Sequence, residues 1–180
     1  MRVYYCNADS DKAAPATRPV SPETLSALGL ELWSRDVDDY QFMLRQAATE
    51  RGFPANAVLE IFDFTLAGCH GNQTEYERTR RRFGERFAHP EDVVACVVSG
   101  EILIDFEDPL AKDASNVIRT FLTPGDLLAV PAGTIQQVFP DGNNKMAFIM
   151  NGEPGLKEIR GKQLENHPVR KNLLSNIGLE

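Results

Sequence analysis

The segment that best indicates the fold is Gly125-Asp126-Leu127-Leu128-Ala129-Val130-Pro131-Ala132-Gly133. It places an apolar run between two glycines with the spacing G-x5-P-x-G. Glycine adopts backbone conformations that other residues avoid, and proline fixes one backbone angle, so both ends of the run are typical of tight turns. The stretch therefore predicts a short buried strand between two sharp turns.

Apolar runs of the same kind, separated by turn signals, extend on both sides of this stretch. We expect six strands, at Val93–Val98, Ile102–Phe106, Val117–Leu122, Leu127–Val130, Ile135–Phe139 and Met146–Met150. Short β-branched runs at regular spacing are typical of an antiparallel sandwich or barrel. The sequence thus predicts a β-barrel core over about 85–152.

The region before the barrel, about 20–84, is expected to be mainly helical. Ser21-Pro22-Glu23 has the hydroxyl cap, first-turn proline and first-turn acid of a helix start. Further helices are expected at Val37–Glu50 and Thr74–Phe83, whereas Val58–Thr65 is apolar and β-prone and its type stays open. A last helix is expected near Val169–Asn176, within a C-terminal extension over 153–180.

The composition favours one domain, 1–180, of a mainly β class with peripheral helices. The chain has 180 residues with 19 Lys and Arg against 26 Asp and Glu, a net charge of −7. An acidic chain binds phosphates poorly, so neither nucleic acid nor an anionic membrane is an expected partner. We expect no secretory signal and no membrane span. The cysteines, Cys6, Cys69 and Cys96, form no CxxC pair and favour reduced thiols in the cytoplasm.

The spacing over Gly125–Gly133 resembles the second conserved motif of the cupins, small β-barrels that hold a metal in the barrel mouth. In that motif a histidine follows the last glycine after two residues, and Gln136 stands there. The first cupin motif, H-x-H-x3-E-x6-G, has its final glycine at Gly100. Its histidine and glutamate positions then fall on Phe87, His89 and Val93.

Further strings make the resemblance more specific. In chain order they are Leu28–Trp33, Glu75–Arg78, Val117–Phe121, Pro124–Asp126, Pro131–Gly133, Gly152–Pro154 and His167–Lys171. Their order and spacing are similar to those of the acireductone dioxygenase family, with a loop insertion around Pro109–Ser115. The resemblance covers nearly the whole chain and implies a cupin barrel.

The resemblance also implies an activity, because the family cleaves an enediol-type substrate with dioxygen at a metal held by three histidines and a glutamate. Of the four corresponding positions, only His89 keeps its residue. The family also places two arginines for an anionic substrate, and those positions fall on Ala95 and Phe148. The replacements turn a polar, cation-lined cavity into a largely apolar one.

These replacements define the candidate site. The catalytic candidates are His89, Glu85 and Gln136, and the candidate substrate-binding residues are Phe87, Val93, Ala95, Phe139 and Phe148. Residues 85, 87, 89, 93 and 95 share parity, so they could face one side of a strand. Glu85 could instead pair with Arg81 or Arg82, and His89 could be a hydrogen-bonded core residue.

Three functions follow, and the leading hypothesis is a metal-independent enzyme without a cofactor. It would act on a small, fairly apolar molecule by isomerisation, cyclisation, elimination or dehydration, in specialised biosynthesis. The second is a dioxygenase that holds Fe²⁺ or Ni²⁺ through His89, Gln136 and a shifted carboxylate, one of Glu85, Glu91 and Asp92. The third is a non-enzymatic binding protein. The expected partners are a small-molecule substrate and, as a possible homodimer, a second copy of the chain.

Overall fold

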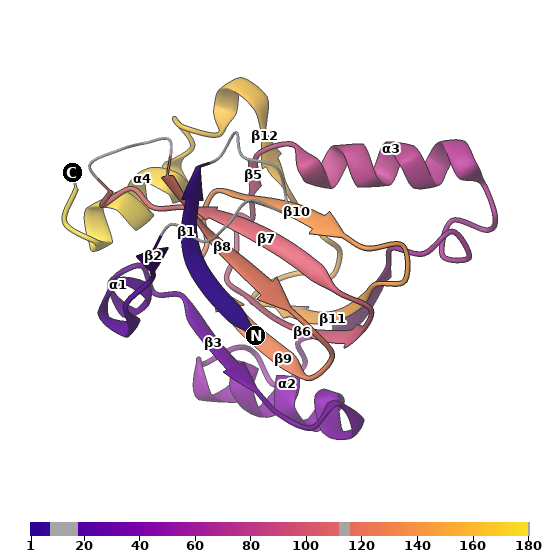
Figure 1. Ribbon diagram of the computed structural model, residues 1–180. Helices are drawn as coiled ribbons and strands as arrows, with labels where there is room; N and C mark the ends of the chain where they lie inside the picture. The colour runs from indigo at the N-terminus through magenta and orange to yellow at the C-terminus, as the bar shows by residue number, and fades with distance from the viewer. Residues whose placement is uncertain (8–17, 112–115, 180) are drawn as a thin grey trace.

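The computed structural model describes residues 1–7, 18–111 and 116–179, and its main feature is a pair of antiparallel sheets that face each other (Figure 1). The larger sheet has the strand order β12-β5-β10-β7-β8-β1-β2. The smaller sheet has the order β3-β9-β6-β11-β4. The predicted mainly β barrel is confirmed.

All six predicted barrel strands are present. They are β6 (Val93–Ser99), β7 (Ile102–Glu107), β8 (Asn116–Leu122), β9 (Asp126–Val130), β10 (Gln136–Pro140) and β11 (Lys145–Met150). The remaining strands are β1 (Arg2–Asn7), β2 (Arg18–Pro19), β3 (Glu31–Ser34), β4 (Leu59–Asp63), β5 (Phe87–Ala88) and β12 (Ile159–Arg160). The segment left open at Val58–Thr65 is therefore a strand, β4, at the edge of the smaller sheet.

The helices lie outside the two sheets. They are α1 (Pro22–Ala27), α2 (Tyr40–Glu50), α3 (Gln73–Gly84) and α4 (Pro168–Asn176), with short 3₁₀ turns at Val37–Asp39 and Gly161–Gln163. The predicted helix start is confirmed, because the Ser21 hydroxyl accepts a hydrogen bond from the Thr24 amide. No helix in the described ranges is long and apolar enough to cross a membrane.

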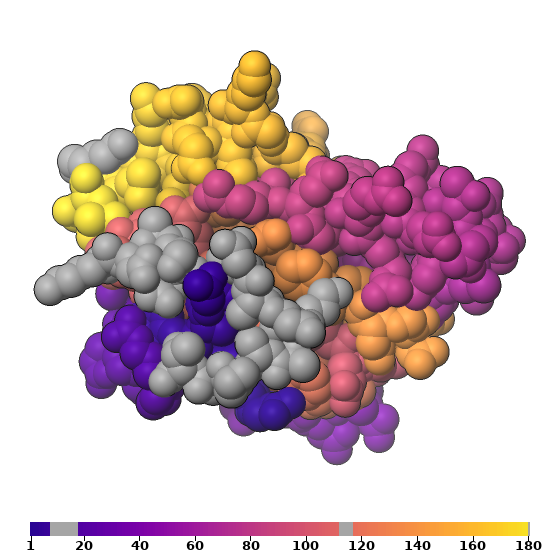
Figure 2. Space-filling model, turned by 45° about the horizontal axis from the view of Figure 1, so that its top comes forward, coloured from indigo at the N-terminus to yellow at the C-terminus, as the bar shows by residue number. Residues whose placement is uncertain are grey.

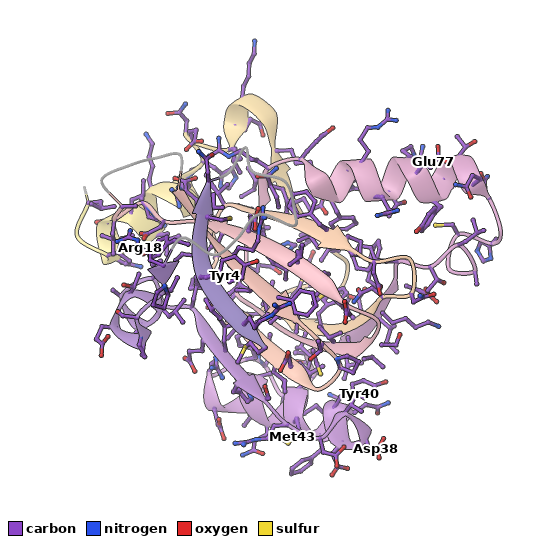
Figure 3. The ribbon with its side chains drawn as sticks, in the orientation of Figure 1. Tyr4, Arg18, Asp38, Tyr40, Met43 and Glu77 are labelled. Carbon is purple, nitrogen blue, oxygen red and sulfur yellow. The ribbon has the colours of Figure 1, made fainter. Side chains whose placement is uncertain are left out.

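The main core fills the space between the sheets, because each strand turns alternate side chains inward. Ile102, Ile104 and Phe106 of β7 all belong to this core. A second apolar cluster joins α2 to the outer face of the smaller sheet, through Leu44 and its contacts with neighbours such as Val94. Figure 3 shows Tyr40 and Met43 on α2, beneath that sheet.

The two glycines of the Gly125–Gly133 segment both adopt positive φ, as the turn prediction requires. Gly125 has φ of 86° and Gly133 has φ of 82°. A side-chain carbon at Gly133 would lie 2.8 Å from the Val169 carbonyl oxygen of α4. Gly133 therefore serves both the turn and the close packing of the C-terminal helix.

Candidate functional site

An apolar cavity lies between the sheets. Its walls are Phe62, Phe64, Phe83, Phe87, His89, Val93, Ala95, Ile104, Leu128, Val130, Gln136, Val138, Met146, Phe148 and Leu156. The two polar members are one histidine and one glutamine. Strands of both sheets supply the walls, so the cavity lies where the barrel places its inward side chains.

Aromatic rings follow one another along one side of the cavity. The ring centroids of Phe64 and Phe83 are 5.0 Å apart, and those of Phe83 and Phe87 are 5.7 Å apart. The Phe87 ring in turn meets the His89 ring at 5.3 Å, edge to face. Edge-to-face pairs are favourable beyond their buried area, so this row fixes the position of the His89 ring.

His89 is held at the end of β5 and is 7% exposed. Its Nδ1 lies 2.8 Å from the backbone oxygen of Lys157. Burial lowers the pKa of His89 below its ordinary value of 6.5, against the opposing effects of the Lys157 carbonyl and the nearby Glu158 carboxylate. The imidazole is therefore neutral at pH 7.

Gln136 opens β10 directly opposite Phe87 of β5. It is 5% exposed and its side chain lines the cavity. Within the ranges that the structure describes, its amide makes no hydrogen bond to a protein group, whereas the neighbouring Gln137 donates to the Gly84 carbonyl at 2.8 Å. Gln136 thus presents free donors and an acceptor to the cavity.

The C-terminal extension contributes Leu156 to the cavity wall, and the residues that follow it contact Phe87 and α3. The Arg160 guanidinium lies 4.6 Å from the centroid of the Phe87 ring. Glu158 pairs with Arg160 at 2.7 Å and with Arg82 of α3 at 2.6 Å. Burial opposes ionisation of Glu158, but the two arginines hold its pKa below its ordinary value of 4.5. Figure 2 shows the C-terminal surface meeting that of α3.

Most of the predicted site residues meet in this cavity. Phe87, His89, Val93, Ala95, Gln136 and Phe148 all line it. Ala95 of β6 stands directly opposite Phe148 of β11, so the two positions expected to lack arginine are neighbours. Phe62, Phe64 and Phe83 also line the cavity and were not predicted from the sequence, although the apolar Val58–Thr65 segment contained a signal for two of them.

Glu85 and Phe139 lie elsewhere, and the expectation that they share the cavity is wrong. Both line an outer groove beside α3. Glu85 is exposed, because it follows α3 and precedes the strand that begins at Phe87, so strand parity does not reach it. Phe139 points away because Gln136 and Val138 take the inward positions of β10.

The donor set does not fit the metal that the resemblance implies. Phe87 and Val93 occupy two of the four ligand positions and carry no donor atom. Of the replacement carboxylates, Asp92 accepts from the Ala132 amide at 2.7 Å. Glu91 contacts Lys157 through one oxygen at 3.5 Å, and its other oxygen is buried without a partner among the described residues. Nowhere among residues 1–7, 18–111 and 116–179 do three or more His, Cys, Asp or Glu side chains gather as a metal site would require.

Two facing antiparallel sheets around an inward cavity define this protein as a cupin barrel. Within that class, the model of the ARD/ARD′ family matches residues 4–147, and the chain belongs to that family.

Relatives match the chain over nearly its full length. It is 31% identical to "Acireductone dioxygenase 1" of Coprinopsis cinerea over 99% of each chain. It is 29% identical to "Acireductone dioxygenase 1" of Physcomitrium patens, over 97% of this chain and 88% of that one. A solved acireductone dioxygenase from Bacillus anthracis, with a cadmium ion in its active centre, shares the fold. That match has a TM-score of 0.64 at 13% identity and covers 88% of this chain and 96% of the other.

These findings contradict the leading prediction of a metal-independent isomerase, cyclase or lyase without a cofactor. The relatives carry the name of dioxygenases, and the family match covers most of the chain. The dioxygenase alternative, with Fe²⁺ or Ni²⁺ as its cofactor, is better supported than a cofactor-free enzyme. The unusual feature of this member is its donor set, in which Phe87 and Val93 replace two of the four ligand side chains.

Proposed function

We propose that this protein binds and oxidises an acireductone-type molecule, an enediol beside a carbonyl group, in the barrel cavity. The observation that carries the proposal is the family match over residues 4–147, which include most of the residues that line the cavity. The name shared by the relatives supports a dioxygen-dependent reaction. Fe²⁺ or Ni²⁺ is the cofactor to test.

The residues of this chain would bind and orient such a molecule. The apolar walls exclude water, which strengthens any hydrogen bond inside the cavity. His89 and Gln136 are the polar groups in the walls, and a neutral imidazole can accept a proton from a substrate hydroxyl. We therefore assign His89 to proton transfer and Gln136 to orientation of the substrate.

Oxygen consumption tests this function. The purified chain is mixed with an acireductone and dioxygen, with Fe²⁺, with Ni²⁺ or with neither. We expect consumption above the protein-free rate in at least one metal condition, and a roughly 100-fold loss in His89→Phe if His89 is the base. Gln137→Leu, on the opposite face of β10, should keep the rate. No consumption under any condition would overturn the proposal.

A second candidate function is binding without catalysis. It is favoured by the lining itself, because phenylalanine and aliphatic side chains supply most of the walls and provide contact area rather than reactive groups. Ligand binding without oxygen consumption would support it over the dioxygenase.

Other expectations from the sequence stay predictions. The three free cysteines favour a cytoplasmic location. A homodimer is tested by the mass of the purified protein in solution, and the pathway is tested by identifying the substrate.

A further inference from the structure

The hydrogen bond at His89 fixes which of its nitrogens carries the proton. A backbone carbonyl can only accept, so the short contact between Nδ1 and the Lys157 oxygen requires a proton on Nδ1. In a neutral imidazole the other nitrogen, Nε2, then has a free lone pair. The ring lines the cavity, and in the described part of the chain Nε2 has no hydrogen-bond partner. His89 therefore offers the cavity an acceptor.

Gln136 supplies the complementary group. Its amide is also without a partner in the ranges described, although the residue is 5% exposed. An amide carries two N–H donors, which suit a carbonyl oxygen. Neither amide atom of Gln136 is among the fully buried atoms that lack a partner in the described ranges, so both open onto the cavity, where a ligand can reach them.

The sheet brings these two groups together. Gln136 is opposite Phe87, and the Gly133 amide donates to the His89 carbonyl at 2.8 Å, so the pairing of the two segments continues past β5. His89 is two residues beyond Phe87, which makes it a diagonal neighbour of Gln136, at roughly 7–8 Å between the backbones. One small molecule above the Phe87 ring could reach both.

The volume of the cavity limits the size of that molecule. The cavity has a volume of about 60 Å³. One water needs roughly 10–15 Å³ by this measure, so the cavity has room for a small molecule. A short chain with an adjacent hydroxyl and carbonyl has this size.

We propose that His89 Nε2 and the Gln136 amide form a paired acceptor and donor that select a small ligand with a hydroxyl next to a carbonyl. The inference rests on the proposed function, since an acireductone contains this arrangement, and it names the two residues that recognise it. Recognition by these two side chains requires neither a bound metal nor turnover. The Lys157 carbonyl acts as the positioning group, because it sets the tautomer of His89.

Two matched probes test the selection. Hydroxyacetone and 2-butanone have the same number of heavy atoms and nearly the same shape, but only hydroxyacetone carries a hydroxyl. Binding of each to the purified full-length chain is measured by ligand-observed NMR titration, without added metal. We expect hydroxyacetone to bind about three- to tenfold more tightly, the effect of one net hydrogen bond.

Variants test which group of the ligand each residue binds. His89→Phe should reduce the preference for hydroxyacetone to about onefold, because it removes the acceptor for the hydroxyl. Gln136→Leu should weaken the binding of both probes by about three- to tenfold and keep the preference, because both probes carry the carbonyl that the amide binds. Gln137→Leu is the matched control, because it makes the same change one residue along, on the other face of β10, and should keep the preference.

A spectroscopic measurement tests the proposal even if a variant fails to fold. Long-range ¹H–¹⁵N NMR of the wild-type histidines should show His89 protonated on Nδ1 and unprotonated on Nε2. A proton on Nε2, equal binding of the two probes, a preference that survives His89→Phe, or an unchanged affinity for both probes in Gln136→Leu would overturn the inference. Selective binding without oxygen consumption would overturn the proposed function alone, whereas oxygen consumption without selectivity would overturn only this inference.

Discussion

Two buried polar sites on the same sheet are built in opposite ways. On one face, Arg119 of β8 and Asp105 of β7 form a two-pronged ion pair, with both N–O distances at 2.7 Å and both side chains 2% exposed. On the other face, His89 Nε2 and the Gln136 amide line the cavity, and no described protein group satisfies them. The first site is complete within the chain, and the second is suited to a ligand.

Strand alternation explains how one sheet carries both sites. Ile104 and Phe106 of β7 face the barrel core, so Asp105 between them faces away from it. Arg119 is directly opposite Asp105 across the β7–β8 pair. A paired buried charge contributes to the fold, while an unpaired buried amide costs stability and is better explained by recognition.

Breaking the complete site should give the largest effect on stability. Arg119→Met leaves the Asp105 carboxylate buried without its partner, and we expect a loss of about 3–5 kcal/mol in the free energy of unfolding. Urea denaturation measures it. The double variant Asp105→Leu/Arg119→Met should be more stable than the single one, because no buried charge remains. A single variant within about 1 kcal/mol of wild type would show that the pair is not the main contributor.

Asp126 extends the comparison to a second fully engaged carboxylate. Burial alone would raise its pKa, but hydrogen bonds from Ser34 and from the Thr123 amide and hydroxyl hold it below the ordinary value of 3.8. Asp126→Asn should cost about 2 kcal/mol at neutral pH, since hydrogen bonds to a charged group are lost.

The sign of its pH dependence follows from the lowered pKa. A carboxylate with a lowered folded pKa stabilises fully above its unfolded value, and that contribution is lost as the pH falls below 3.8 and through the folded pKa. The difference between wild type and Asp126→Asn in urea midpoint should therefore shrink in acid. A difference that stays constant from pH 6 to pH 2.5 would contradict the assignment.

Gln136 and Gln137 allow an amide without a protein partner and a hydrogen-bonded amide to be compared within one strand. Gln136→Leu replaces an amide that no described protein group satisfies with an apolar side chain, and it should stabilise the protein by about 1 kcal/mol at the expense of ligand affinity. Gln137→Leu removes the hydrogen bond to Gly84 and should destabilise it by about 1 kcal/mol. Thermal unfolding of the two variants side by side provides the measurement. Equal losses in both would mean that the Gln136 amide has a partner in solution.

An exposed ion pair sets the lower limit of these effects. Arg78 and Glu75 of α3 contact each other at 2.6 Å, but their side chains are 73% and 41% exposed. Solvent screens such a pair, so Arg78→Met should change the unfolding free energy by only about 0–0.5 kcal/mol. Figure 3 shows Glu77 on the same helix. A loss above about 1 kcal/mol would indicate a contact beyond this pair.

Much of the site could be predicted from the resemblance to the cupin motifs, with support from strand alternation. The resemblance, anchored on Gly100, implied the positions of Phe87, His89 and Val93, and the structure places all three on the cavity wall. The same parity failed for Glu85, because alternation holds only within a strand and a helix ends at Gly84. Alternation also places Phe139 outward, because Gln136 and Val138 of the same strand face the cavity.

The other side of the cavity could not be predicted from local patterns. Phe64 and Phe83 come from an edge strand and a helix, and Leu156 comes from an extension with little regular structure. Their contacts join residues far apart in the sequence. The carbonyl of Lys157 that sets the His89 tautomer is 68 residues from it.

The sequence alone determined the class of fold and the polar groups available to the site, because turn glycines, apolar alternation and motif spacing act over a few residues. It did not determine which polar groups are paired. Asp105 and Arg119 are ordinary charged residues in the sequence, and Gln136 and Gln137 are adjacent and chemically identical. Only the tertiary structure decided that one glutamine faces an apolar cavity and the other a backbone carbonyl, since hydrogen-bond satisfaction depends on what distant segments bring within 3 Å or so.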